Sequence, residues 1–233
     1  MGLSALTRSV IPMPVRMAFR TTRFVMTTRM HGFQIPSEPH FDAESSDFFH
    51  HVVAHVTHYL EYGSGGSTVQ AHRHARTLVS VDSDGRFLKD VGRKIRQDGS
   101  ATRTNLIHAN IGLTKAWGVP VFTKPTARRL KRWRGYVQAP WKYYREHGVQ
   151  PDLILVDGRF RVACVLESLL NLTPQSECRI LFDDYASRPH YSVVERFADL
   201  VCMKGRMAVF RRKPDMDVEA CRQALEEHYT DHR

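Results

Sequence analysis

Apolar runs and amphipathic stretches alternate along the chain from about residue 42 onward. The runs that have the length and composition of buried strands lie at 59–62, 77–82, 105–111, 152–157, 179–183 and 200–210, the last turning back on itself at Lys204-Gly205-Arg206. Helical spacing is found between them, at 45–56, after Gly66, at 85–95, 159–171, 190–198 and 215–229. Strands that alternate with helices predict an α/β fold, a mostly parallel sheet with helices on both faces.

Composition is consistent with one globular domain. The chain has 233 residues, of which 42% are hydrophobic, and no apolar run approaches the roughly 18–20 residues that a membrane-spanning helix needs. Its four cysteines form no C-x-x-C pair, so neither a zinc ribbon nor a disulfide framework is encoded. We therefore expect no membrane partner, reduced thiols and a cytoplasmic protein, with the domain at 38–233.

Two segments carry the net charge of +10. Residues 1–37 contain five arginines and no acid, which is typical of an organellar, mitochondrial-type leader or a disordered arm; a start of translation further along is a third interpretation. Residues 124–148 hold eight basic groups against Glu146 alone, within a basic aromatic insert at about 113–150. The rest of the chain is close to neutral.

A glycine-rich loop follows the first predicted strand. Gly63, Ser64, Gly65, Gly66 and Ser67 stand where the backbone must turn tightly from strand to helix and let a ligand approach. No lysine follows the glycines, which excludes a phosphate-binding P-loop, and Thr68 occupies the place of the third glycine of a dinucleotide fingerprint. The loop favours a nucleoside without a pyrophosphate.

Asp82 lies 19 residues beyond Gly63, at the end of the second predicted strand. A carboxylate in that place can accept two hydrogen bonds from ribose hydroxyls. Asp84 is a rival, although its position favours capping the next helix. The alternative interpretation is an ordinary glycine turn, with Asp82 as a capping residue.

These residues resemble the first motif of the class I S-adenosylmethionine-dependent methyltransferases, an acidic residue, any residue, then Gly-x-Gly. Glu61-Tyr62-Gly63-Ser64-Gly65 matches it, and Asp82 stands where the family's ribose-binding acid does. The resemblance covers roughly residues 42–212. It implies a seven-stranded Rossmann-like sheet with an antiparallel last strand, S-adenosyl-L-methionine as cofactor, and a set of binding residues made up of Glu61, Gly63, Ser64, Gly65, Gly66, Ser67, Asp82, Asn110 and Asp157.

Three carboxylates close the fourth and fifth predicted strands: Asp157, Asp183 and Asp184. Because the ends of parallel strands meet at one edge, we expect them to converge. Oxygen ligands suit Mg²⁺, and the set is similar to the metal-binding residues of catechol-type O-methyltransferases, with Asp184 where that family has Asn. The alternatives are that Asp157 or Asp183 is a general base toward a hydroxyl, or that the acids cap helices and turns.

The insert interleaves its basic residues with Trp133, Tyr136, Trp141, Tyr143 and Tyr144. Such a mixture can bind RNA or an acidic or phosphorylated acceptor, or can form a solvated helix whose aromatic side packs on the sheet. Pro120, Pro125 and Pro140 indicate that part of the segment is loop. The three alternatives stay open.

His51, His55 and His58 have a spacing that would let zinc bind, but His58 falls in the first predicted strand and no acid completes the set. The sequence thus favours an S-adenosylmethionine-dependent methyltransferase directed to oxygen, with an unknown acceptor. The rival hypotheses are a nucleic-acid-binding module that keeps the fold without the chemistry, and a dinucleotide-dependent oxidoreductase.

Overall fold

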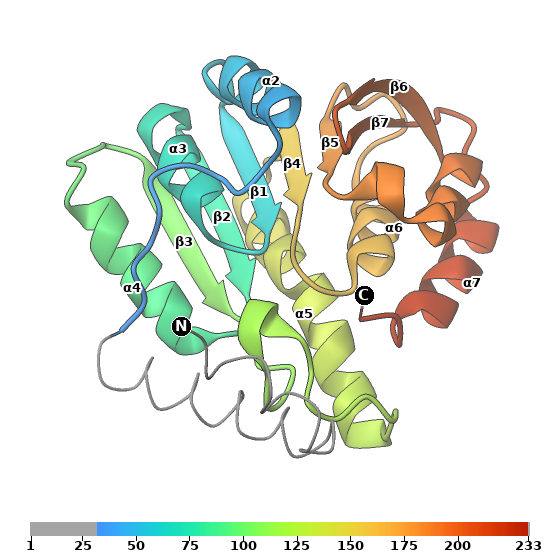
Figure 1. Cartoon of the computed structure of the whole chain (residues 1–233). Helices are drawn as coiled ribbons and strands as arrows, with labels where there is room; N and C mark the ends of the chain where they lie inside the picture. Colours follow the sequence, from blue (N-terminus) through green and yellow to red (C-terminus); the bar gives the residue numbers. More distant parts are fainter. Residues whose placement is uncertain (1–31, 233) are drawn as a thin grey trace, which may run out of the picture.

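The computed structural model describes residues 32–232. Its centre is a seven-stranded sheet of order β3-β2-β1-β4-β5-β7-β6, in which β7 alone runs against its neighbours (Figure 1). The strands are β1 (His58–Tyr62), β2 (Thr77–Asp82), β3 (Arg103–His108), β4 (Leu153–Val156), β5 (Arg179–Phe182), β6 (Ala198–Lys204) and β7 (Met207–Arg212). The expected Rossmann-like sheet and the terminal hairpin are confirmed.

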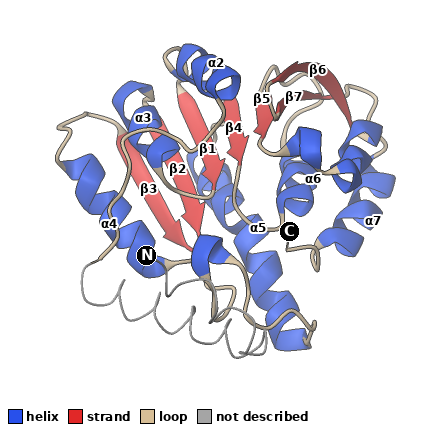
Figure 2. Cartoon of the chain, in the orientation of Figure 1, coloured by secondary structure: helices blue, strands red, loops and turns tan. Residues whose placement is uncertain are grey.

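Helices cover both faces of this sheet (Figure 2). One face carries α5 (Ala127–His147), α6 (Arg161–Asn171) and α7 (Val218–His228), and the other carries α2 (Ala43–Val53), α3 (Gly66–His74) and α4 (Gly85–Arg96). Short 3-10 helices are η2 (Ala116–Gly118), η3 (Tyr185–Ser187) and η4 (Pro189–Arg196). This is the layered arrangement that alternating strands and helices predict.

Alternation within each strand divides the core in two. In β1, Leu60 packs with the α5 and α6 side while Tyr59 packs with the α2 and α3 side, and both are fully buried. Ile154 and Leu155 repeat the division in β4. Because neighbouring residues of a strand point to opposite faces, a strand buried on both sides reads as an unbroken apolar run.

Several predicted boundaries are wrong; α7, for example, begins at Val218 and not at residue 215, and α2 ends at Val53 and not at residue 56. Helix α2 begins at Ala43, not at residue 45, because the carboxylate of Asp42 caps it by accepting the backbone N–H of Ser45 at 3.1 Å. Strand β3 is Arg103–His108, whereas the apolar pattern predicts 105–111. The helix predicted at 190–198 is the 3-10 helix η4, which starts at Pro189.

Pro120 and Pro125 lie in the non-helical stretch before α5, as predicted, whereas α5 runs unbroken for 21 residues through Pro140. A proline inside a helix removes one hydrogen bond and costs about 3 kcal/mol. Burial of Tyr136, Val137, Trp141 and Tyr144 around it offsets that cost. Within residues 32–232 no helix, α5 included, is both long enough and apolar enough to cross a membrane.

Residues 32–42, here called the N-terminal strap, cross the α2, α3 and α4 side of the domain (Figure 1). The Phe33 N–H donates to Asp90 of α4 at 2.7 Å, and the backbone of Glu38 lies directly on Gly66 at the start of α3. At its far end, the carbonyl of His40 accepts from Arg206 at 2.6 Å. The end of the predicted basic arm is therefore packed on the domain, and residues 1–31 lie outside the described residues.

Candidate functional site

The glycine loop joins β1 to α3 at the carboxyl edge of the sheet. Gly63 has φ of +97°, and a Cβ built on it would lie 2.7 Å from the backbone nitrogen of Gly158. Only glycine fits such a position. A Cβ on Gly66 would collide with the strap, whereas one on Gly65 meets nothing within 4 Å. The loop is thus closed on two sides, with open space beside Gly65.

Glu61 lies beneath this loop and is fully buried. Its carboxylate accepts hydrogen bonds from the hydroxyls of Tyr59 at 3.0 Å, Ser67 at 2.9 Å and Ser80 at 2.7 Å, and from Thr68. Burial raises the pKa of Glu61 to about 7, although these hydrogen bonds oppose the rise. The structure therefore places Glu61 and Ser67 as supports that shape the loop from below.

The raised pKa of Glu61 makes the stability of the ligand-free protein depend on pH. Between pH 4.5 and 7 the folded chain keeps a proton that the unfolded chain has released, so stability falls as pH rises, by about 3 kcal/mol across this window. Glu61→Gln should remove the part of the fall that Glu61 contributes, because glutamine cannot ionise and still fits among rotating hydroxyls, and should leave the parts that Asp82 and Asp157, whose pKa values are also raised, contribute.

Calorimetric Tm values of the ligand-free variants between pH 4.5 and 8 provide the measurement. Glu44→Gln, at an exposed position in the first turn of α2, is the control and should follow the wild-type curve. Equal slopes for wild type and Glu61→Gln would show that Glu61 is already ionised throughout.

Asp82 closes β2 next to the glycine loop. Its carboxylate accepts the backbone N–H groups of Ser64 at 3.0 Å and Asp84 at 2.8 Å, and burial raises its pKa to about 6. Asp84 caps α4 by accepting from Arg86 at 2.9 Å and Phe87 at 3.1 Å, as its position predicts. Asp82 is the acid that lies beside the loop.

The segment after β3 covers the same edge. Asn110 lies just beyond β3, and its side-chain oxygen accepts from the N–H of Gly112 at 2.9 Å. Further along, a Cβ on Gly118 would lie 2.8 Å from the hydroxyl of Ser83 and 3.6 Å from Cγ of Arg159. The segment therefore returns across the ends of β2 and β4.

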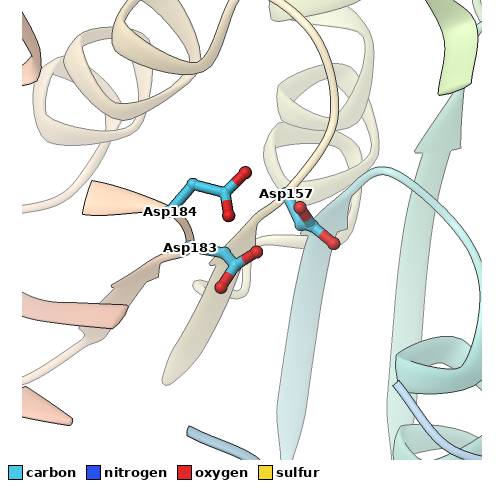
Figure 3. A group of neighbouring side chains, drawn as sticks. All are labelled: Asp157, Asp183 and Asp184. Carbon is cyan, nitrogen blue, oxygen red and sulfur yellow. The ribbon is translucent and has the colours of Figure 1, made fainter. Parts of the chain in front are cut away.

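Asp157, Asp183 and Asp184 come together at the ends of β4 and β5 (Figure 3), each offering an oxygen within 4.8 Å of the others. Three arginines pair with them. Arg161 contacts Asp157 at 2.8 Å and Asp184 at 3.0 Å, Arg188 contacts Asp184 at 2.9 Å, and Arg206 contacts Asp183 at 2.9 Å and Asp184 at 3.1 Å. Three negative charges therefore face three positive charges.

This pairing does not fit a bound Mg²⁺. A cation would have to displace guanidinium groups from all three acids, and those guanidinium groups already neutralise the cluster.

The burial of these acids also limits which of them can act as a general base. Asp183 is 1% exposed and both of its oxygens accept from Arg206 at 2.9 Å. The side chain of Asp157 is 33% exposed, and burial raises the pKa of Asp157 to about 7 against the opposing effect of Arg161. Asp157 is thus the most exposed of the three acids, ahead of Asp184, whose side chain is 23% exposed.

Five aromatic residues of the insert, all on α5, pack inward, whereas Trp117 and Phe122, before α5, are 78% and 54% exposed. Trp133, Tyr136, Trp141, Tyr143 and Tyr144 are buried against the sheet and α6. The exposed side of the segment carries basic residues, namely Lys124, Arg128, Lys131, Arg134, Lys142 and Arg145. This is the solvated helix with its aromatic side on the sheet. These five aromatic rings are not exposed for stacking on nucleic acid bases.

The three histidines with zinc-like spacing do not form a cluster. His51 lies on α2 and His55 just beyond its end, with their ring centroids 5.8 Å apart, while His58 belongs to β1 and hydrogen bonds to the hydroxyl of Thr77 at 2.7 Å. Among residues 32–232, only the aspartate cluster brings at least three potential metal ligands together.

Two sets of residues that shape the candidate site could not be identified from the sequence. Arg161, Arg188 and Arg206 look like ordinary surface arginines, although Arg161 is 3% exposed. Tyr136, on α5, places its hydroxyl where a side chain on Gly158 would stand, and it accepts the N–H of Arg159 at 3.4 Å. The apolar pattern around Tyr136 predicts core packing only. Its contact with the β4 end depends on the crossing of α5 behind the sheet.

Known structures provide the comparison. The chain is similar to a methyltransferase-like protein from Silicibacter pomeroyi, with 30% sequence identity and a TM-score of 0.72 over 84% of this chain and 100% of that one. An O-methyltransferase from Bacillus cereus is more distant, at 13% identity and a TM-score of 0.48, covering 88% of this chain and 95% of that one. The N-methyltransferase NodS from Bradyrhizobium japonicum has 11% identity and a TM-score of 0.44, covering 73% and 89%. No family model matches the sequence, and no curated protein does.

Proposed function

The chain belongs to the class I S-adenosylmethionine-dependent methyltransferases, and on that premise we propose that it methylates an oxygen atom of a small acceptor. The observation that carries the proposal is the open space beside Gly65, bordered by the tight turn at Gly63 and by Asp82. A glycine loop and an acid at the ends of adjacent parallel strands are the arrangement that holds a nucleoside ligand.

The residues of this edge fit S-adenosylmethionine. The backbone from Gly63 to Gly66 would hold its methionine part, Asp82 its ribose, and Asn110 its adenine. Asp82 uses each oxygen for one backbone N–H, at 3.0 Å and 2.8 Å, and a carboxylate oxygen can accept more than one hydrogen bond. The two backbone hydrogen bonds, from Ser64 and Asp84, hold this acid in place at the sheet edge.

Bound S-adenosylmethionine supplies a methyl group already activated on a sulfonium. The protein then has to align the acceptor and exclude water, and alignment of this kind contributes on the order of 7–11 kcal/mol. Asp157 is the group that would accept the proton of an acceptor hydroxyl, because its pKa of about 7 leaves a large carboxylate fraction at neutral pH. Arg161 holds Asp157 in position from behind at 2.8 Å.

Calorimetric titration with S-adenosylhomocysteine tests the proposal. Asp82→Ala should weaken binding by about 1.5–3 kcal/mol if the acid makes charge-assisted hydrogen bonds to the ribose. Asp84→Asn is the matched control, since asparagine also caps helices, and it should bind as the wild type does.

A second ligand separates direct contact from an effect on the loop. A 2′-deoxy analogue of S-adenosylhomocysteine should bind the wild type more weakly than the parent ligand does, while Asp82→Ala should bind both equally. If Asp82→Ala keeps the full preference for the hydroxylated ligand, Asp82 does not hold the ribose. If the wild type does not bind S-adenosylhomocysteine at all, the proposed function fails.

A further inference from the structure

Arg159 is a partly buried arginine whose guanidinium has no partner among residues 32–232. Its Nε is shielded from solvent and forms no hydrogen bond, and within residues 32–232 no ion pair involves Arg159. The other arginine with a shielded, unpartnered Nε is Arg211, which pairs with Glu177 at 3.1 Å. Among the arginines that the structure describes, Arg159 alone combines a shielded, unpartnered Nε with the absence of an ion pair. A shielded N–H of a partly buried guanidinium is costly to leave without a hydrogen bond, so this environment favours an anion that can accept it.

Its position is central to the site. Arg159 follows Asp157-Gly158 at the end of β4, and its backbone N–H donates to the hydroxyl of Tyr136. On the other side, Gly118 brings the segment after β3 against both the Cγ of Arg159 and the hydroxyl of Ser83, the residue next to Asp82. Arg159 therefore lies between the proposed ribose acid and the aspartate cluster.

The charges around Arg159 favour an anionic guest. Asp157 is the nearest acid, but it is paired with Arg161 at 2.8 Å. Burial, followed by the charge of Arg161, lowers the pKa of the Arg159 guanidinium. Because three arginines already balance the three aspartates, Arg159 adds an uncompensated positive charge at the place where the acceptor would lie.

We propose that Arg159 is a specificity-determining residue that binds a carboxylate or phosphate group of the methyl acceptor. That the bound anion belongs to the methyl acceptor rests on the proposed function, whereas the anion site itself rests on Arg159 alone. Arginine suits both groups because its planar fork presents two parallel N–H donors to a pair of oxygens. The acceptor is then a small hydroxylated acid or phosphate ester.

The experiment uses the full chain and three probes, titrated in the presence of saturating S-adenosylhomocysteine and again without it. The probes are 4-hydroxybenzoate, phenyl phosphate and the neutral compound phenol, measured by calorimetry at low salt. Arg159→Met removes the charge and Arg159→Lys keeps it without the fork. Arg86→Met, at an exposed position in the first turn of α4, is the control.

We expect at least one anionic probe to bind the wild type and Arg86→Met alike, and to bind Arg159→Met roughly tenfold or more weakly. The affinity of Arg159→Lys for this probe should lie between those of the wild type and Arg159→Met, and phenol should bind all variants alike. The preferred anionic probe identifies the acceptor group as carboxylate or phosphate.

Two results would overturn the proposal. One is equal affinity of wild type and Arg159→Met for both anionic probes. The other is a loss of S-adenosylhomocysteine affinity in Arg159→Met, which would assign the guanidinium to the ligand's own carboxylate. Failure of the wild type to bind S-adenosylhomocysteine, with anion binding intact, removes the proposed function and leaves the anion site standing.

Discussion

Replacing Gly63 with alanine is expected to destabilise the protein by roughly 3 kcal/mol and to abolish binding of S-adenosylhomocysteine. The left-handed backbone, at φ of +97°, costs an L-residue about 1–2 kcal/mol. The new methyl group would also lie 2.7 Å from the backbone nitrogen of Gly158, and overpacking of this kind costs about 1–3 kcal/mol. The loop must therefore move, and the binding surface moves with it. Urea denaturation and calorimetric titration measure the two effects.

Gly148 provides the matched control for this substitution. It ends α5 with φ of +62°, but a Cβ there meets nothing within 4 Å. Gly148→Ala should therefore cost only the backbone strain, about 1 kcal/mol, and should keep full ligand affinity. If the two alanine variants lose the same stability, the close approach of Gly63 and Gly158 has no energetic weight.

Replacing Arg161 with methionine should destabilise the folded state by about 3 kcal/mol, the cost of leaving a buried ion pair without one partner. Arg161 is 3% exposed, and besides Asp157 and Asp184 it donates to the backbone carbonyls of Gly158 and Asp183. The substitution should also raise the pKa of Asp157 further, because Arg161 is what opposes the effect of burial.

Arg188 is the comparison for this prediction, since it contacts Asp184 at 2.9 Å with a side chain that is 27% exposed. Arg188→Met should cost about 1 kcal/mol or less. Urea midpoints at neutral pH rank the two variants, and Arg161→Lys, which keeps the charge, provides a reading if Arg161→Met fails to fold. Equal losses at positions 161 and 188 would contradict a central role for Arg161.

The fold was predictable because its signals are local. Unbroken apolar runs such as Leu153–Val156 mark strands covered on both faces, and Asp84 marks a helix start by its own chemistry. Where the prediction of an element failed, contacts with neighbouring elements determine the structure. Strand β3 begins with the polar run Arg103–Asn105 because pairing with β2 holds it there. Helix α5 passes Pro140 because its aromatic side is buried.

The candidate site was predictable only in part. Residues at the ends of strands meet because parallel strands end at one edge, which brought Asp157, Asp183 and Asp184 together as expected. Their charge balance was not visible, because Arg206 reaches Asp183 from the turn of a hairpin and Arg188 reaches Asp184 from the start of η4. The burial of Glu61 among hydroxyls likewise depends on how α3 packs on β1.

Tyr136 and Gly158 are 22 positions apart in sequence and belong to different segments, yet they are in contact: the side chain of Tyr136 leaves no room for a side chain at position 158. The tyrosine hydroxyl stands where a methyl group at position 158 would be, and it also accepts the N–H of Arg159. A Cβ at 158 would also lie 2.9 Å from the backbone nitrogen of Gly63, so in homologous chains a relative that carries alanine at 158 should have lost the hydroxyl at 136 and should have a shifted glycine loop. A residue of α5 thereby restricts which residues can stand at the carboxyl end of β4, where the candidate site lies.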